Sequence, residues 1–420
     1  MSKTETNYAV ARDIFAAKGI DTEQAMEVLR ATPISVHCWQ IDDLTGFESF
    51  DSVLTGGIQA TGNAPGKPRS IEEYVEHLRE AFSYIPGALK LALHAVYPVT
   101  EKKVERNAIR PEHFKFWVNF AKEQKIGLDF NPTYFSHPMA ASGLTLTSPD
   151  EGVRNYWIEH GIASRRIGEY FGRELGQVCI TNHWIGDGSK DYRIDKVTPR
   201  MRLIESLDRI FADKIDSGFN LDSVESKLFG LGVESYTPGS HEFYTNYVMT
   251  RNNCIICLDT GHFHPTEMVS DKLSSYLAFG KEIMLHVSRG VRWDSDHVVM
   301  FDDETRAIMQ EIVRYDALNR VHIGTDYFDA SINRIAATVI GTRNAKKALL
   351  YALLQPNRQL IEVEASGDFT KRLALYEEAR TLPVGMVWDM FCEREGVEGS
   401  EWIDTLERKL TPKGSWRSSI

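Results

Sequence analysis

The sequence is poor in cysteine, with five in 420 residues. Such a sparse and odd-numbered set excludes a disulfide framework of the kind that stabilises small secreted domains. Cys254 and Cys257 have the spacing of a redox or zinc pair, but they lie in an apolar, strand-like run. In a strand, an offset of three places two side chains on opposite faces. We therefore interpret both as buried strand cysteines, with a redox or zinc pair as the alternative.

Long apolar runs and an excess of basic residues are also missing. No run approaches the roughly 20 apolar residues that span a bilayer, and residues 1–13 contain no apolar core of a signal peptide. Lys and Arg number 48 against 59 Asp and Glu, for a formal net charge of −11. General nucleic-acid binding requires a basic face instead. We expect a soluble, cytoplasmic protein that binds neither nucleic acid nor membranes.

No nucleotide-binding motif is present either. The glycine-rich segment 55–67 would need Gly at position 61 and Ser or Thr at position 68 to form a phosphate-binding loop, but Thr61 and Pro68 stand there. The sequence therefore implies no nucleotide cofactor. We predict that 55–67 is a lid over the functional site and that it carries the apolar Ile58. The alternative is a static surface loop.

Strand-like and helix-like segments alternate through most of the chain. Short runs enriched in apolar or β-branched residues predict eight strands, at Ser35–Trp39, Leu89–Tyr97, Leu128–Pro132, Val178–Ile185, Ser223–Phe229, Ile255–Gly261, Ile283–Ser288 and Val321–Asp326. This order favours an α/β fold with a single (β/α)₈ TIM barrel over a doubly wound sheet.

Helix signals and length suggest how the rest of the chain is organised. Ser70 and Glu73 have the spacing of a capping box, and apolar periodicity predicts a helix over 303–318. We expect an N-terminal helical segment at 1–33, a barrel that carries the functional site at 34–357, and a C-terminal helical extension at 358–420. The extension exceeds what a barrel needs, so we expect it to pack under the barrel or between subunits.

Ionisable residues gather at the carboxyl ends of the last four predicted strands, where barrel active sites lie. They are Glu225, Lys227, Asp259, His262, His286, Asp294, Asp296 and Asp326. Crowded carboxylates repel one another, and a bound divalent cation relieves that repulsion. Oxygen donors with one or two imidazoles suit Mn²⁺, Mg²⁺, Co²⁺ or Zn²⁺.

Simpler interpretations exist for single members of this set. A lone Asp at a strand end is commonly a helix cap, and a lone His in a strand is commonly a hydrogen-bonded core residue. We assign Asp302 and Asp329 to helix starts, and His264 and His297 either to the surroundings of the metal ligands or to polar loops. The convergence of four strands on one place favours a metal site for the set as a whole.

Several long motifs resemble those of the L-rhamnose isomerase family. They are Val36-His-Cys-Trp-Gln40, Leu54-Thr-Gly-Gly-Ile-Gln-Ala-Thr-Gly-Asn63, Leu128-Asp-Phe-Asn-Pro132, Val224-Glu-Ser-Lys-Leu-Phe-Gly230, Leu258-Asp-Thr-Gly-His-Phe-His-Pro-Thr-Glu267, His286-Val-Ser-Arg289, Val291-Arg-Trp-Asp-Ser-Asp-His-Val298 and His322-Ile-Gly-Thr-Asp326. The resemblance runs from about residue 7 to about residue 410. It implies a metal-dependent barrel, usually a homotetramer, that is distantly similar to xylose isomerase.

The resemblance also implies a reaction and a division of the ligands. One structural divalent ion, such as Zn²⁺ or Mn²⁺, would be held by Glu225, Asp259, His286 and Asp326. The catalytic Mn²⁺ would be held by His262, Asp294 and Asp296. The two ions would hold O1 and O2 of the open-chain sugar as L-rhamnose and L-rhamnulose interconvert by a hydride shift, a step of L-rhamnose catabolism. Asp296 would assist proton transfer between the oxygens, and Lys227 would stabilise the developing charge.

Further residues are candidates for contact with the sugar. His94, at the end of the second predicted strand, is suited to opening the pyranose ring, with a structural His as the alternative. Ile58 on the predicted lid would cover the C6 methyl group. Stacking on the sugar is predicted for aromatic residues near strand ends, with barrel core as the alternative for each: Trp39, Phe130, Phe135 and Trp184.

Three rival functions remain at this stage. One is an isomerase of the same fold that acts mainly on other aldoses. The second is a metallohydrolase or endonuclease barrel, which would use its metals to activate water and would not need a Lys beside them. The third is a sugar-binding protein without catalysis, which the carboxylate cluster disfavours.

Overall fold

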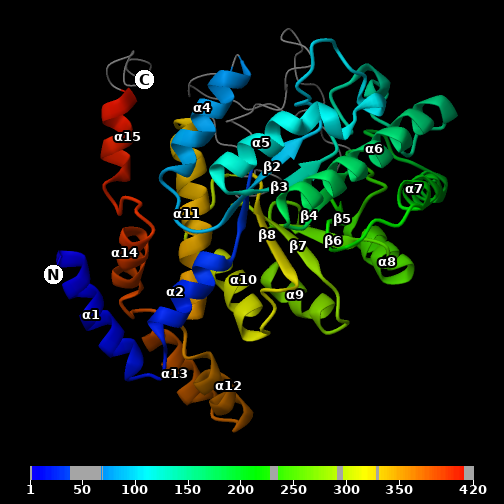
Figure 1. Ribbon diagram of the computed structural model, residues 1–420. Helices are drawn as coiled ribbons and strands as arrows, with labels where there is room; N and C mark the ends of the chain where they lie inside the picture. Colours follow the sequence, from blue (N-terminus) through cyan, green and yellow to red (C-terminus); the bar gives the residue numbers. More distant parts are fainter. Residues whose placement is uncertain are drawn as a thin grey trace.

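The computed structural model describes residues 2–37, 68, 70–227, 235–290, 297–327 and 331–410. Eight parallel strands pair in chain order, and β1 pairs with β8 to close a barrel (Figure 1). The strands are β1 Ile34–Val36, β2 Leu89–His94, β3 Gly127–Asn131, β4 Cys179–Trp184, β5 Asn220–Glu225, β6 Ile255–Asp259, β7 Ile283–Val287 and β8 Val321–Thr325. The predicted (β/α)₈ barrel is confirmed.

One α-helix of the outer ring follows each strand (Figure 1). In chain order these are α4 Ile71–Phe82, α5 Lys115–Gln124, α6 Glu151–Leu175, α7 Val197–Ile210, α8 His241–Arg251, α9 Ser270–Leu277, α10 Asp303–Arg314 and α11 Arg334–Leu353. Three 3₁₀ helices interrupt the loops after β2 and β3: η1 Arg106–Ala108, η2 Pro111–Phe114 and η3 Pro138–Ala140.

Local signals fix where several helices begin and end. The Ser70 hydroxyl accepts a hydrogen bond from the backbone N–H of Glu73 at 3.2 Å, while the Glu73 carboxylate contacts Arg334 on α11 at 3.4 Å. Asp302 caps α10 as expected, accepting from Thr305 N–H. Helix α10 ends at Arg314, four residues before the predicted end, because Asp316 adopts a left-handed conformation at φ 50°.

The barrel interior is filled at its amino-terminal end. Ile180, Ile255, Cys257 and Met284 form a buried apolar cluster between neighbouring strands. An ion pair also lies in this part of the barrel, because Lys90 Nζ contacts Asp129 Oδ1 at 2.9 Å and both side chains are buried. This filled base leaves the carboxyl ends of the strands as the place for chemistry.

The two cysteines around β6 differ in burial but share a raised thiol pKa. Cys257 is a fully buried residue of β6, as predicted, whereas Cys254 precedes the strand and is only partly buried, so the prediction for it was wrong; neither forms a disulfide. Burial raises the pKa of both thiols above the ordinary range. Raised thiol pKa values argue against a redox pair, because the thiolate is the reactive form.

Helices at both ends of the chain pack together beside the barrel. They are α1 Lys3–Ala16, α2 Thr22–Ala31, α12 Asn357–Ala365, α13 Phe369–Ala379, α14 Val384–Arg394 and α15 Trp402–Leu410, and α1 lies along α14 (Figure 1). Arg343 of α11 holds the tail by donating to the carbonyls of Glu398 and Gly399. Its guanidinium also lies over Trp388 and Trp402. Among the described helices, none has the length and apolarity to cross a bilayer.

A buried lysine makes stability depend on pH. Lys346 of α11 is fully buried, and its Nζ donates to the Ala88 carbonyl at 3.0 Å. Burial lowers the pKa of Lys346 to about 7. The unfolded chain keeps this proton up to a pH of about 10.4, so the unfolded state binds more protons between these values and stability rises with pH.

We expect wild type to gain roughly 2 to 3 kcal/mol of unfolding free energy relative to Lys346→Met between pH 6.5 and 9. Urea denaturation midpoints of both proteins across this range measure the difference. Lys371→Met, on the exposed side of α13, serves as the control and should show no such trend. A difference between wild type and Lys346→Met that stays constant with pH would contradict the expectation.

Candidate metal centre

Four ionisable side chains meet at the carboxyl ends of β5 to β8. Glu225 ends β5, Asp259 ends β6, His286 lies on β7, and Asp326 follows β8. The register pairs His286 with Asp259 on one side and with Gly324 on the other. Because alternate residues share a face of a strand, this register turns all four side chains inward. One ligand atom from each lies within 4.8 Å of the others, and all four residues are buried within the barrel mouth.

The imidazole of His286 stands at the centre of this cluster. Its Nδ1 lies 2.9 Å from Glu225 Oε2, 3.3 Å from Asp326 Oδ2 and 3.7 Å from Asp259 Oδ2. Within the described residues, this buried nitrogen makes no hydrogen bond of acceptable geometry. A nitrogen that faces three carboxylates without such a bond can serve as one ligand among several around a shared cation. The donor set fits a divalent ion that prefers oxygen with one imidazole.

The electrostatics keep the carboxylates ionised. Burial alone would raise the pKa of Glu225, but the nearby charges of His286 and His262 outweigh it and hold the pKa well below the ordinary range. Burial would likewise raise the pKa of Asp326, but His37 and His286 lower it. Burial opposes protonation of His286, yet Cys257 and Glu225 raise its pKa. A cation that binds here therefore meets Glu225 and Asp326 already deprotonated.

His262 lies beside the four-residue cluster on the loop after β6. Its Nδ1 is 3.0 Å from Glu225 Oε1 and 3.0 Å from the Ser226 carbonyl. The backbone N–H of Gly261 donates to Asp259 Oδ1 at 2.7 Å, which fixes the turn that presents His262. The structure thus brings His262 to the same place as the first ligand set. Its two predicted companions, Asp294 and Asp296, lie outside the described residues.

An aromatic wall adjoins the carboxylates. Trp184, at the end of β4, lies under the ammonium group of Lys227, whose Nζ is 4.6 Å from the ring centroid. Phe135 packs edge-on against Trp184, with ring centroids 5.3 Å apart, and His94 lies 6.4 Å from Phe135. The sequence analysis predicted all four of these residues as parts of the functional site. The structure therefore places a cation, two aromatic rings and an imidazole along one side of the barrel mouth.

His94 connects this wall to the carboxylate cluster. Its ring lies 4.8 Å from that of His37, and His37 Nδ1 is 3.2 Å from Asp326 Oδ1. The Nδ1 of His94 is 3.1 Å from the Thr133 hydroxyl. Burial, followed by the charge of His37, lowers the pKa of His94 well below the ordinary range. The imidazole is therefore neutral near pH 7.

Two described positions from the sequence analysis, Phe130 and His264, lie apart from this cluster. Phe130 packs edge-on against Phe114 and Phe171 among the outer helices, so its interpretation as a sugar-stacking residue is wrong and its alternative as core holds. His264 is exposed and hydrogen bonds to Thr266. His297 pairs with Arg289 through backbone hydrogen bonds. Trp39, Ile58 and Asp329 lie outside the described residues.

The structure adds residues that the sequence analysis did not assign to the site. Asn182 donates to Glu225 Oε2, and Ser223 donates in turn to Asn182 Oδ1, so a hydrogen-bonded chain orients the glutamate. Arg106 donates to the Thr133 and Phe135 carbonyls at 2.6 Å each and so fixes the loop that carries Phe135. The available signal was the spacing of two between Ser223 and Glu225, which places both side chains inside the barrel.

Comparison with known proteins agrees with this architecture. The model of the L-rhamnose isomerase (RhaA) family matches residues 2–410. The L-rhamnose isomerases of Salmonella paratyphi B and Salmonella enteritidis PT4 are each 53% identical over 418 residues, which cover 99% of this chain and all of the relative.

Solved structures show more distant likeness. A 3-keto-D-glucoside 4-epimerase from E. coli has a TM-score of 0.45 at 9% identity, over 70% of this chain and 97% of its own. An L-ribulose 3-epimerase has a TM-score of 0.42 at 11% identity, over 72% of this chain and 94% of its own. The family match, the identity over nearly the whole length and the barrel together show that this chain belongs to the L-rhamnose isomerase family.

Proposed function

We propose that this chain interconverts L-rhamnose and L-rhamnulose as a metal-dependent aldose–ketose isomerase. The observation that carries the proposal is the buried imidazole of His286 facing three carboxylates at the barrel mouth. The family membership of the chain and the names of its relatives supply the substrate.

Two groups of residues would hold the metal. Glu225, Asp259, His286 and Asp326 have the chemistry and proximity to hold one divalent ion. We propose Mn²⁺ for a second, catalytic ion, held by His262 together with two carboxylates of the sequence motif, Asp294 and Asp296. A bound divalent ion supplies Lewis-acid stabilisation of charge on the sugar oxygens.

The residues around the ligands suggest further roles. Lys227 places a buried ammonium group beside the cluster, where a fixed cation stabilises negative charge on a substrate oxygen. The face of Trp184 fixes that ammonium group through a cation–π contact. Neutral His94 can accept a proton from the ring hydroxyl when the pyranose opens. Asp296 is proposed, from the sequence alone, to assist proton transfer between O1 and O2.

The sugar would lie against the aromatic wall. Phe135 and Trp184 present apolar surface near the cluster, which suits the carbon face of a deoxy sugar. Trp39 and Ile58 remain sequence-based proposals for further contacts, with Ile58 on a lid over the C6 methyl group. Cytoplasmic location, a homotetramer, a role in L-rhamnose catabolism and oligomer contacts by residues 358–420 are likewise proposals from the family resemblance.

Hydrogen transfer is expected to occur directly between C1 and C2 of the sugar. L-rhamnose labelled with deuterium at C2 should therefore give L-rhamnulose that keeps the label at C1 in ordinary water. Mass spectrometry and proton NMR of the ketose measure retention, and the reaction without protein serves as the control. Extensive washout of deuterium would indicate an enediol and a general base instead, and absence of any ketose would contradict the proposed substrate.

A further inference from the structure

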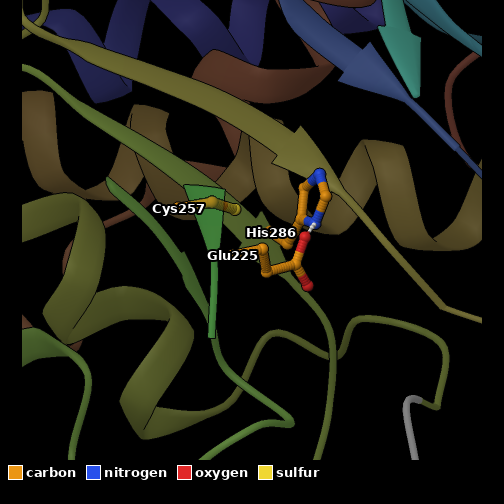
Figure 2. A group of neighbouring side chains, drawn as sticks. All are labelled: Glu225, Cys257 and His286. Carbon is orange, nitrogen blue, oxygen red and sulfur yellow. Dashed lines mark ion pairs between the residues drawn. The ribbon is translucent and has the colours of Figure 1, made fainter. Parts of the chain in front are cut away.

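The side chain of Cys257 points into the barrel just beneath the carboxylate cluster. Cys257 precedes Asp259 by two residues on β6, so both side chains share the inner face of the strand. The register pairs Cys257 with Glu225 on β5 and with Met284 on β7. Figure 2 shows the thiol directed toward the Glu225 carboxylate and the His286 ring, which are themselves joined as an ion pair.

These three side chains form a compact set of sulfur, oxygen and nitrogen donors. The Cys257 sulfur, one Glu225 oxygen and one His286 nitrogen all lie within 4.8 Å of one another, and all three residues are buried. The exposed fractions are 0% for Cys257 and 2% for both Glu225 and His286. His286 Nδ1 makes no hydrogen bond of acceptable geometry within the described residues, although it is buried. The set therefore contains a nitrogen available to a metal ion.

We propose that Glu225, Cys257 and His286 form a further, alternative metal position, deeper in the barrel, that takes thiophilic divalent ions such as Zn²⁺ or Cd²⁺. Thiolate ligands select such ions, whereas carboxylates favour Mn²⁺ and Mg²⁺. Binding replaces the thiol proton by the ion, and the proton passes to solvent. No oxidation or reduction takes place.

The deeper position cannot be filled independently of the oxygen-rich one. Both use Glu225 and His286, whereas Asp259 and Asp326 belong only to the oxygen-rich set. An ion drawn toward the thiol therefore takes two ligands from the structural ion of the oxygen-rich set, which lies beside the catalytic one. This competition rests on the proposed function, because it assumes that the oxygen-rich position supports turnover.

The competing interpretation treats Cys257 as a small apolar residue of the barrel interior. The thiol does pack in the cluster with Ile180, Ile255 and Met284, and a buried thiol behaves as a small hydrophobic group. The two interpretations differ in one observable property, which is whether sulfur enters the coordination shell of a bound thiophilic ion.

X-ray absorption of the full-length, metal-stripped protein loaded with one equivalent of Zn²⁺ measures that property. We expect one sulfur neighbour at about 2.3 Å, together with nitrogen and oxygen at about 2.0–2.2 Å. Cys257→Ser should lose the sulfur neighbour, and Cys254→Ser, just before the same strand, should keep it. Cys257→Ala provides a second variant if the serine variant does not fold.

Two outcomes would overturn the proposed zinc site, and neither depends on which substrate the enzyme uses. They are a zinc shell of nitrogen and oxygen alone in wild type, and a sulfur neighbour that persists in the Cys257 variants. Competition is then measured by adding Zn²⁺ to Mn²⁺-loaded protein. Half-inhibition, measured for each protein against its own zinc-free rate, should need at least about tenfold more Zn²⁺ in Cys257→Ser than in wild type. A tenfold change in concentration corresponds to about 1.4 kcal/mol. Equal concentrations would overturn the competition.

Discussion

Glu225→Gln is expected to reduce turnover of L-rhamnose by roughly 10³-fold and to lower the metal content of the purified protein. Glu225 lies 2.9 Å from His286 of its own ligand group and 3.0 Å from His262 of the other group, so its loss should disturb both. The substitution removes one negative charge. If the new amide nitrogen faces Asn182, two hydrogen-bond donors meet and the present hydrogen bond from Asn182 is lost. Loss of metal-based stabilisation worth several kcal/mol corresponds to a rate change of this size.

Initial rates and elemental analysis of purified Glu225→Gln test this expectation. Glu282→Gln is the matched control, because Glu282 pairs with His322 at the opposite end of the barrel, 3.0 Å away. It should keep both metal and activity. His262→Ala should also lose activity but should melt closer to wild type, because His262 lies on a loop and Glu225 lies within a strand. Normal metal content and rate in Glu225→Gln would contradict the ligand assignment.

Lys227→Met is expected to reduce kcat/KM by about 10²-fold while leaving the metal content unchanged. Removal of one preorganised group that stabilises transition-state charge costs an effect of this order. Methionine keeps most of the apolar length that packs on Trp184 but loses the charge. The defect should therefore fall mainly on the chemical step rather than on folding.

Steady-state kinetics, elemental analysis and melting temperature separate these effects. Lys281→Met is the control, because Lys281 bonds to Asn252 at a solvent-exposed position. It should resemble wild type in all three measurements. A Lys227→Met protein with wild-type kcat/KM would exclude an electrostatic role for the lysine, and one that has lost its metal would show that Lys227 supports the ligands instead.

The barrel and its ligand cluster were predictable because charge at strand ends is conspicuous in the sequence. Glu225, Asp259, His286 and Asp326 each interrupt or end an apolar run, and the closed parallel barrel brings such ends together. The prediction that Phe130 stacks on the sugar was wrong because it considered only the position of Phe130 near a strand end and not the direction of its side chain. It alternates with Asp129 and Asn131, whose side chains face the interior, so Phe130 must face the surrounding helices.

Residues that act through hydrogen bonds were not predictable from their type alone. Asn182 and Ser223 look like ordinary polar strand residues, and only the pairing of β4 with β5 shows that they orient Glu225. Arg106 precedes Phe135 by 29 residues, with α5 and β3 between them, so its contact with the Phe135 carbonyl depends on tertiary packing. Sequence spacing describes neighbours within one element, whereas these contacts join different elements.

The central claim is that carboxylates and imidazoles at the barrel mouth hold the divalent metal required for isomerisation of L-rhamnose. The most direct measurement is ketose formation from L-rhamnose by metal-stripped protein that is resupplied with one ion at a time. We predict no turnover in the stripped protein and recovery with Mn²⁺ or Co²⁺. Full turnover by protein that elemental analysis shows to be free of metal would contradict the claim.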